Sequence, residues 1–154
     1  MDDVNYAGFW IRTGAAIIDS ILIMLVIGSL MSFMFGASLE PDTPLPQLLL
    51  RFSLELGLGA FAIILFWVYR AATPGKMMLK LIIVDARTGG KPSTGQLIGR
   101  YLAYYVSILP FMLGIIWVGL DKRKQGWHDK LAGTVVIRVN TTREAPVKRE
   151  PADP

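Results

Sequence analysis

The stretch RTGAAIIDSILIMLVIGSLMSFMF, residues 12–35, decides the fold of this chain. From Thr13 to Leu39 the sequence runs for 27 residues with a single formal charge, Asp19. A helix that crosses a membrane needs about 20 mostly apolar residues, so this stretch predicts a first membrane span. The acids Asp2 and Asp3 precede it, and its apolar run is long, which indicates an uncleaved span rather than a signal peptide.

The carboxylate inside this span calls for a partner. Burying a charge near the middle of a membrane helix costs roughly 2.5 kcal/mol or more, so Asp19 is expected to face a partner, a cavity or a pathway. Arg12 lies on the same helical face, about 10.5 Å away along the axis. Side chains lean toward the helix N-terminus, so Asp19 leans toward Arg12, and water or a third residue could bridge the remaining distance.

The composition fits one small membrane domain. The chain has 154 residues, of which 53% are hydrophobic and only 18% are charged. It has no cysteine, and its one histidine, His128, is interpreted as structural. We therefore expect no enzyme, no cofactor and no metal site. The basic residues flank apolar segments, which indicates contact with the lipid bilayer and not with nucleic acid.

A second span is predicted from Leu45 to Tyr69, after a loop that contains three prolines. Its charges, Arg51 and Glu55, stand four residues apart and can pair on one helical face. The loop before this span is acidic, whereas the segment after it is rich in lysine and arginine. By the positive-inside rule, the N-terminus and the segment after the second span are cytoplasmic.

A third apolar segment, residues 101–120, contains Pro110 near its centre. It forms either one kinked span or two half-helices that re-enter the membrane. Basic residues on both flanks favour re-entry, which leaves the C-terminus cytoplasmic. Ser93 and Gln96 match a capping box and predict a helix start before this segment.

Two runs of β-branched residues are predicted to pair as a small cytoplasmic β-hairpin. They are Leu81–Asp85 and Val135–Val139. The fold expected is thus an all-α membrane protein with two transmembrane helices, a Pro-broken third segment and this hairpin. The membrane domain covers residues 6–139, and residues 140–154 are predicted to be a disordered tail.

Several short motifs together resemble the RDD family of small bacterial membrane proteins. They are YAGFWIR at 6–12, Asp19, TPGK at 73–76, VDA at 84–86, GGKPS at 89–93 and HDKLAGT at 128–134. The family is named for an arginine at the start of its first helix, an aspartate within that helix and a second aspartate. These match Arg12, Asp19 and Asp129, with Asp121 as the competing match for the last. The resemblance implies a role in transport, with some members similar to sodium/proton antiporters.

Two classes of function remain open. A transporter of an ion or small solute would use Asp19 as the cation or proton site and Arg12 as its electrostatic partner. Because two or three spans are few for a pathway, it would need a homo-oligomer or another membrane protein. A structural or accessory protein would instead use Arg12, Asp19 and Asp129 as a packing clamp. Either way, the three residues are expected to converge at the cytoplasmic end of the first span, in the bacterial inner membrane.

Overall fold

Two long helical rods dominate the computed structural model, which describes residues 5–36 and 43–139. The first rod consists of α1 (Phe9–Ile23), a π-helical turn η1 (Met24–Gly28) and α2 (Ser29–Phe35), and the second is α3 (Leu45–Arg70). Both rods are long and apolar enough to cross a membrane, so the two predicted spans are confirmed. The tail predicted for residues 140–154 lies outside the described residues.

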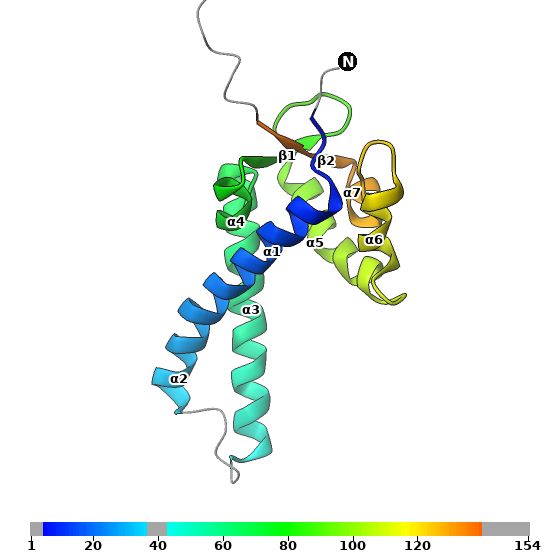
Figure 1. Cartoon of the computed structure of the whole chain (residues 1–154). Coiled ribbons are helices and arrows are strands. Elements are labelled where there is room, and N and C mark those ends of the chain that lie inside the picture. Colours follow the sequence, from blue (N-terminus) through cyan, green and yellow to red (C-terminus); the bar gives the residue numbers. More distant parts are fainter. Residues whose placement is uncertain (1–4, 37–42, 140–154) are drawn as a thin grey trace, which may run out of the picture.

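The first rod begins earlier than its uncharged run suggests. Helix α1 starts at Phe9, after Gly8 in an extended conformation, so Arg12 lies one turn inside the helix rather than at its end. The apolar residues Phe9, Trp10 and Ile11 form the first turn of this helix together with Arg12. Figure 1 shows the two rods crossing near one end and separating toward α2.

A two-stranded antiparallel sheet lies at the end of the molecule where the rods cross (Figure 1). Strand β1 (Leu81–Asp85) follows the short helix α4 (Pro74–Met78), and β2 (Thr134–Arg138) is the last element described. The predicted strand pairing is confirmed, with Leu81 opposite Arg138, although β2 begins one residue earlier than expected. The connection between the strands contains three helices, so it is long rather than a tight turn.

The third apolar segment is broken, as Pro110 predicts. Helix α5 (Thr94–Ile108) begins with the expected capping box of Ser93 and Gln96, and α6 (Leu113–Leu120) turns away from it by 100°. Phe111 and Met112 adopt left-handed backbone angles at this bend. A short helix, α7 (Trp127–Ala132), then leads into β2.

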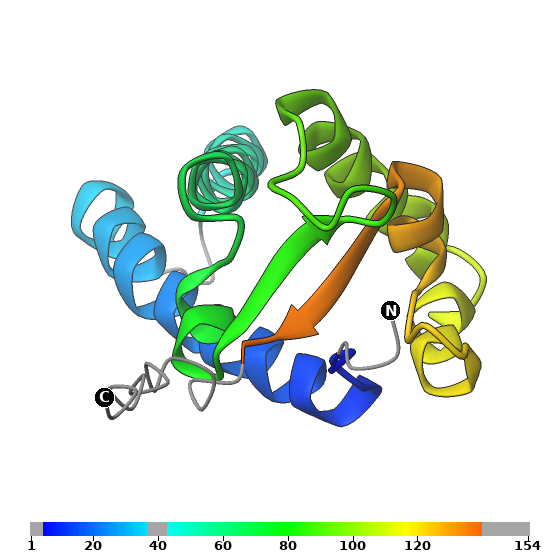
Figure 2. The same cartoon turned by 90° about the horizontal axis from the view of Figure 1, so that it is seen from above.

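The buried core lies beneath the sheet, where α1, α3 and α5 meet. Figure 2 shows the strands lying across the middle of this end, with α1 along one side and α3 and α5 along the other. The core residues are Ala7, Ala15, Trp67, Leu81, Ile83, Leu97 and Val136. Because the packing is concentrated here, buried charged groups at this end are fixed by several elements at once.

Candidate functional site

All three nitrogens of the Arg12 guanidinium group donate hydrogen bonds, one to the segment just before α1 and two to later parts of the chain. Its Nε donates to the Ala7 carbonyl at 2.8 Å, and its two terminal nitrogens donate to Asp129 at 2.6 Å and to the Lys124 carbonyl at 2.5 Å. The planar fork of arginine suits such divergent acceptors. The predicted contact between Arg12 and Asp129 is therefore present.

Asp129 is fully buried at the start of α7 and binds two arginines. One carboxylate oxygen accepts from Arg12 and from the Gly126 backbone N–H at 3.0 Å, and the other accepts from Arg100. Burial alone would raise the pKa of Asp129, but Arg100 and Arg12 outweigh it and hold that pKa well below its ordinary value. We call Arg12, Arg100 and Asp129 the arginine clamp.

Arg100 is the member of the clamp that the sequence analysis did not single out. It is fully buried on α5, and besides Asp129 it donates to the Thr134 hydroxyl at 2.7 Å. The sequence counts it only among the basic residues that flank the third apolar segment. The capping box at Ser93 was the available signal, because it places Arg100 two turns inside a helix, next to an uncharged run.

Asp19 lies apart from the clamp and forms no ion pair with Arg12. Its carboxylate accepts from the Thr73 hydroxyl at 2.5 Å and from the Gly75 backbone N–H at 2.7 Å. The expected convergence of three residues is thus corrected to two separate groups. The reason is geometric: seven residues of helix separate Arg12 from Asp19 by about 10.5 Å, and the turn before α4 comes closer.

Gly75 makes this close approach possible. A Cβ atom at that position would lie 2.3 Å from the Ala15 carbonyl oxygen and 3.0 Å from the Asp19 carboxyl group. Only a glycine lets the backbone N–H reach the carboxylate at this separation. We call Asp19, Thr73 and Gly75 the Asp19 site.

The Asp19 site borders two cavities between the helices. One, of about 320 Å³, lies among α1, α3 and α5, and Trp67, Tyr101 and Tyr104 line it together with Asp19. The other, of about 380 Å³, has an almost wholly apolar lining on the α3 and α4 side. Asp19 is therefore partly exposed to these cavities, whereas Asp129 is not exposed at all.

Lys76 is a buried cation between the two groups. It is 7% exposed, its Nζ lies 5.1 Å from the centre of the Trp67 ring, and no ion pair forms with it among residues 5–36 and 43–139. Burial, reinforced by the nearby Arg100 and Arg12, lowers the pKa of Lys76 to about 7. Its charge therefore depends on pH in the physiological range.

His128 and Asp121, the other singled-out residues, have separate surroundings. His128 stacks on Tyr104 with ring centroids 3.9 Å apart, and burial lowers its pKa to about 3. Asp121 pairs with Lys130 at 2.5 Å, outside the clamp. In the part of the chain that the structure describes, no three histidine or acidic side chains are placed to hold a metal ion.

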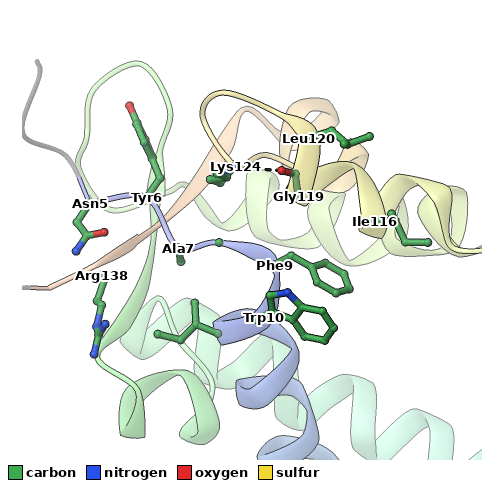
Figure 3. A pocket seen from close by; sticks show the side chains of 12 residues that line it. Asn5, Tyr6, Ala7, Phe9, Trp10, Ile116, Gly119, Leu120, Lys124 and Arg138 are labelled. Atoms are coloured by element: carbon green, nitrogen blue, oxygen red, sulfur yellow. Dashed lines mark hydrogen bonds between the residues drawn. The ribbon is translucent and has the colours of Figure 1, made fainter.

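A groove of about 620 Å³ lies outside the clamp, between the start of α1 and α6. Figure 3 shows Phe9 and Trp10 on one side of it, Ile116 and Leu120 on the other, and Lys124 donating to the Gly119 carbonyl. Trp10 is 82% exposed, as suits a tryptophan at a membrane interface. Neither Arg12 nor Asp129 lines this groove, so the clamp is closed on that side.

Two apolar spans, a bent third segment and buried arginine–aspartate contacts define a small helical membrane protein. The chain belongs to the RDD family, whose model matches residues 6–133. This match confirms the resemblance inferred from the motifs.

Two proteins that are described as uncharacterized are similar to this chain in sequence. The uncharacterized protein RP437 of Rickettsia prowazekii (strain Madrid E) is 45% identical over 75 residues, which cover 49% of this chain and 41% of that protein. The uncharacterized protein YxaI of Bacillus subtilis (strain 168) is 32% identical over 149 residues, which cover 85% of this chain and 96% of that protein. The match thus spans less than half of the Rickettsia protein, and no solved structure matches significantly.

Proposed function

We propose that this protein transports a small cation across the bacterial inner membrane, with Asp19 as the site that binds a proton or sodium ion. The observation that carries the proposal is the environment of Asp19. Its carboxylate sits within the first span, borders two cavities, and is held by a hydroxyl and a backbone N–H rather than by a cation. An acidic side chain inside a membrane span typically marks an ion or proton pathway.

The arginine clamp has a different role in this proposal. Arg12 is committed to Asp129 and two backbone carbonyls, so it fixes α1 and does not neutralise Asp19. Binding of a proton or sodium ion would then remove the unpaired charge of Asp19 inside the membrane. Two cations competing for one carboxylate are the simplest basis for sodium/proton exchange.

We propose that the protein works as a homo-oligomer. Two spans and one bent segment are few to enclose a pathway, and the lipid-facing sides of both rods expose many large apolar side chains. We also propose a cytoplasmic N-terminus, because the segment that follows α3 carries many lysines and arginines.

The test is ion flux in proteoliposomes that contain the purified protein. A sodium gradient should drive proton movement, read with an internal pH dye, and Asp19→Asn should abolish it. The matched control is Asp121→Asn, which removes a carboxylate that pairs with Lys130 away from the cavities. Flux by Asp19→Asn at the wild-type rate would refute the assignment of the cation site.

The arginine clamp favours a second candidate, a non-transporting accessory membrane protein. Asp129 is fully buried and bound by two arginines, an arrangement suited to holding helices together. On this reading, well-folded wild-type protein gives no flux under sodium, potassium or proton gradients. That result would replace the transport proposal.

A further inference from the structure

A second polar region lies farther along the same two rods, where they separate. It is a crevice of about 820 Å³ between η1 and α2 on one side and α3 on the other. Figure 1 shows the rods diverging there. Its polar lining consists of Ser20, Ser29, Ser32, Arg51 and Glu55, and we call it the serine crevice. None of these residues belongs to the clamp or to the Asp19 site.

The ion pair in the serine crevice is not symmetrical. Arg51 is 8% exposed and donates to the Gly36 carbonyl at 2.8 Å, to Ser32 at 3.3 Å and to one oxygen of Glu55 at 3.0 Å. The side chain of Glu55 is 35% exposed, and its second oxygen accepts no hydrogen bond from the described residues. The guanidinium group of Arg51 is thus buried against the backbone, while the carboxylate of Glu55 faces the open space.

Lipid cannot satisfy these groups. Hydrocarbon offers no hydrogen bonds, so a carboxylate oxygen and serine hydroxyls at membrane depth require protein partners or water. The π-helical turn at Met24–Gly28 lies beside the crevice, and such turns are frequent at functional sites. The crevice therefore presents donors and acceptors that suit water better than lipid.

The crevice also reaches toward the proposed cation site. Ser20 lines both the serine crevice and the 320 Å³ cavity that Asp19 borders, and so does Ile23. The two spaces therefore border the same turn of α1. Ser20, the neighbour of Asp19 in the sequence, is the polar residue common to both linings.

We propose that the serine crevice is a water-filled vestibule that attracts small cations through Glu55 and leads them to Asp19. The vestibule opens on the side of the membrane opposite to the sheet. The claim that the vestibule leads to a transport site rests on the proposed function. The claims that it holds water and prefers cations are independent of that function.

Labelling of single cysteines tests the proposal without any flux measurement, because the chain has no native cysteine. Ser29→Cys places a thiol in the crevice, and Leu30→Cys places one on the next residue, which does not line it and is 46% exposed. A membrane-impermeant cationic methanethiosulfonate reagent should modify Ser29→Cys much faster than Leu30→Cys. Equal, slow modification of both would show that the crevice is dry and would overturn the proposal.

A second comparison isolates Glu55. In the Ser29→Cys background, the cationic reagent should react faster than an anionic one. Glu55→Gln should reduce that ratio severalfold, because the loss of one negative charge slows the cation and speeds the anion. Glu55→Asp keeps the charge and should retain the ratio. An unchanged ratio in Glu55→Gln would overturn the cation-attracting role. Labelling as expected together with absent ion flux would leave the vestibule standing and remove the transport proposal.

Discussion

Replacing Asp129 with asparagine should destabilise this protein strongly, because its carboxylate is the acceptor that the buried Arg100 and the partly buried Arg12 share in the clamp. The substitution keeps the shape but presents an NH₂ group to one of the two guanidinium groups. Asp129 is 0% exposed, and Arg100 is buried with it. Leaving one partner of a buried pair uncompensated costs roughly 3–5 kcal/mol.

The measurement is thermal unfolding in detergent. For a chain of about 150 residues, each 1 kcal/mol shifts the midpoint by roughly 2–4 °C, so Asp129→Asn should melt roughly 6–20 °C below the wild type. The matched control is Asp121→Asn, which breaks the pair with Lys130, whose side chain is 44% exposed. Such exposed pairs contribute about 1 kcal/mol or less, so the control should shift by only a few degrees.

A small effect would contradict this account of the clamp. If Asp129→Asn melts within about 2 °C of the wild type, a shift worth about 1 kcal/mol or less, then the two arginines do not depend on this carboxylate. Equal shifts in Asp129→Asn and Asp121→Asn would carry the same meaning. The fold would then be held by its spans and sheet alone.

Three further predictions concern neighbouring residues. Arg12→Ala should lower the melting temperature more than Asp19→Asn does, because asparagine can still bond to a hydroxyl and to a backbone N–H; the reverse order would contradict the division into two groups. Gly75→Ala should cost about 1–3 kcal/mol of stability, because its methyl group would lie 2.3 Å from a carbonyl oxygen of α1, whereas Gly95→Ala, with nothing closer than 4.0 Å, should melt like the wild type. Burial lowers the pKa of Lys76 from its ordinary value of 10.5 to about 7, so the unfolded chain binds this proton more tightly than the folded protein does. The melting temperature of the wild type should therefore rise as the pH is raised from 7 to 10. Melting curves of Lys76→Met over the same pH range should not show that rise.

The spans and the strand pairing could be predicted from the sequence because each depends on a local pattern. The apolar run after Arg12 is long enough to cross a bilayer, and two short β-branched runs could only pair with each other. Pro110 marked the break in the third segment correctly, since it cannot donate a hydrogen bond within a helix. Even so, the π-helical turn had no signal in the residues around it.

The candidate site was harder to predict, because its contacts join residues far apart in the chain. Arg12 and Asp129 were correctly paired through the motifs that contain them. Arg100 was missed, since a basic residue beside an apolar segment is usually explained by membrane orientation. Asp19 was assigned the wrong partner, because the approach of Gly75 depends on how α4 packs and not on any spacing along α1.

The contacts between the two ends of the described chain have a consequence for the order of synthesis. Asn5 and Ala7 form backbone hydrogen bonds with β2, and Arg12 pairs with Asp129. These partners leave the ribosome only after both rods and the bent segment have been made. The nascent chain must therefore carry Arg12 and Arg100 without their shared carboxylate until α7 emerges. Completion of the last strand is thus the event that locks the earliest residues in place, and a chain stopped before α7 would present unpaired arginines to the cell's quality control.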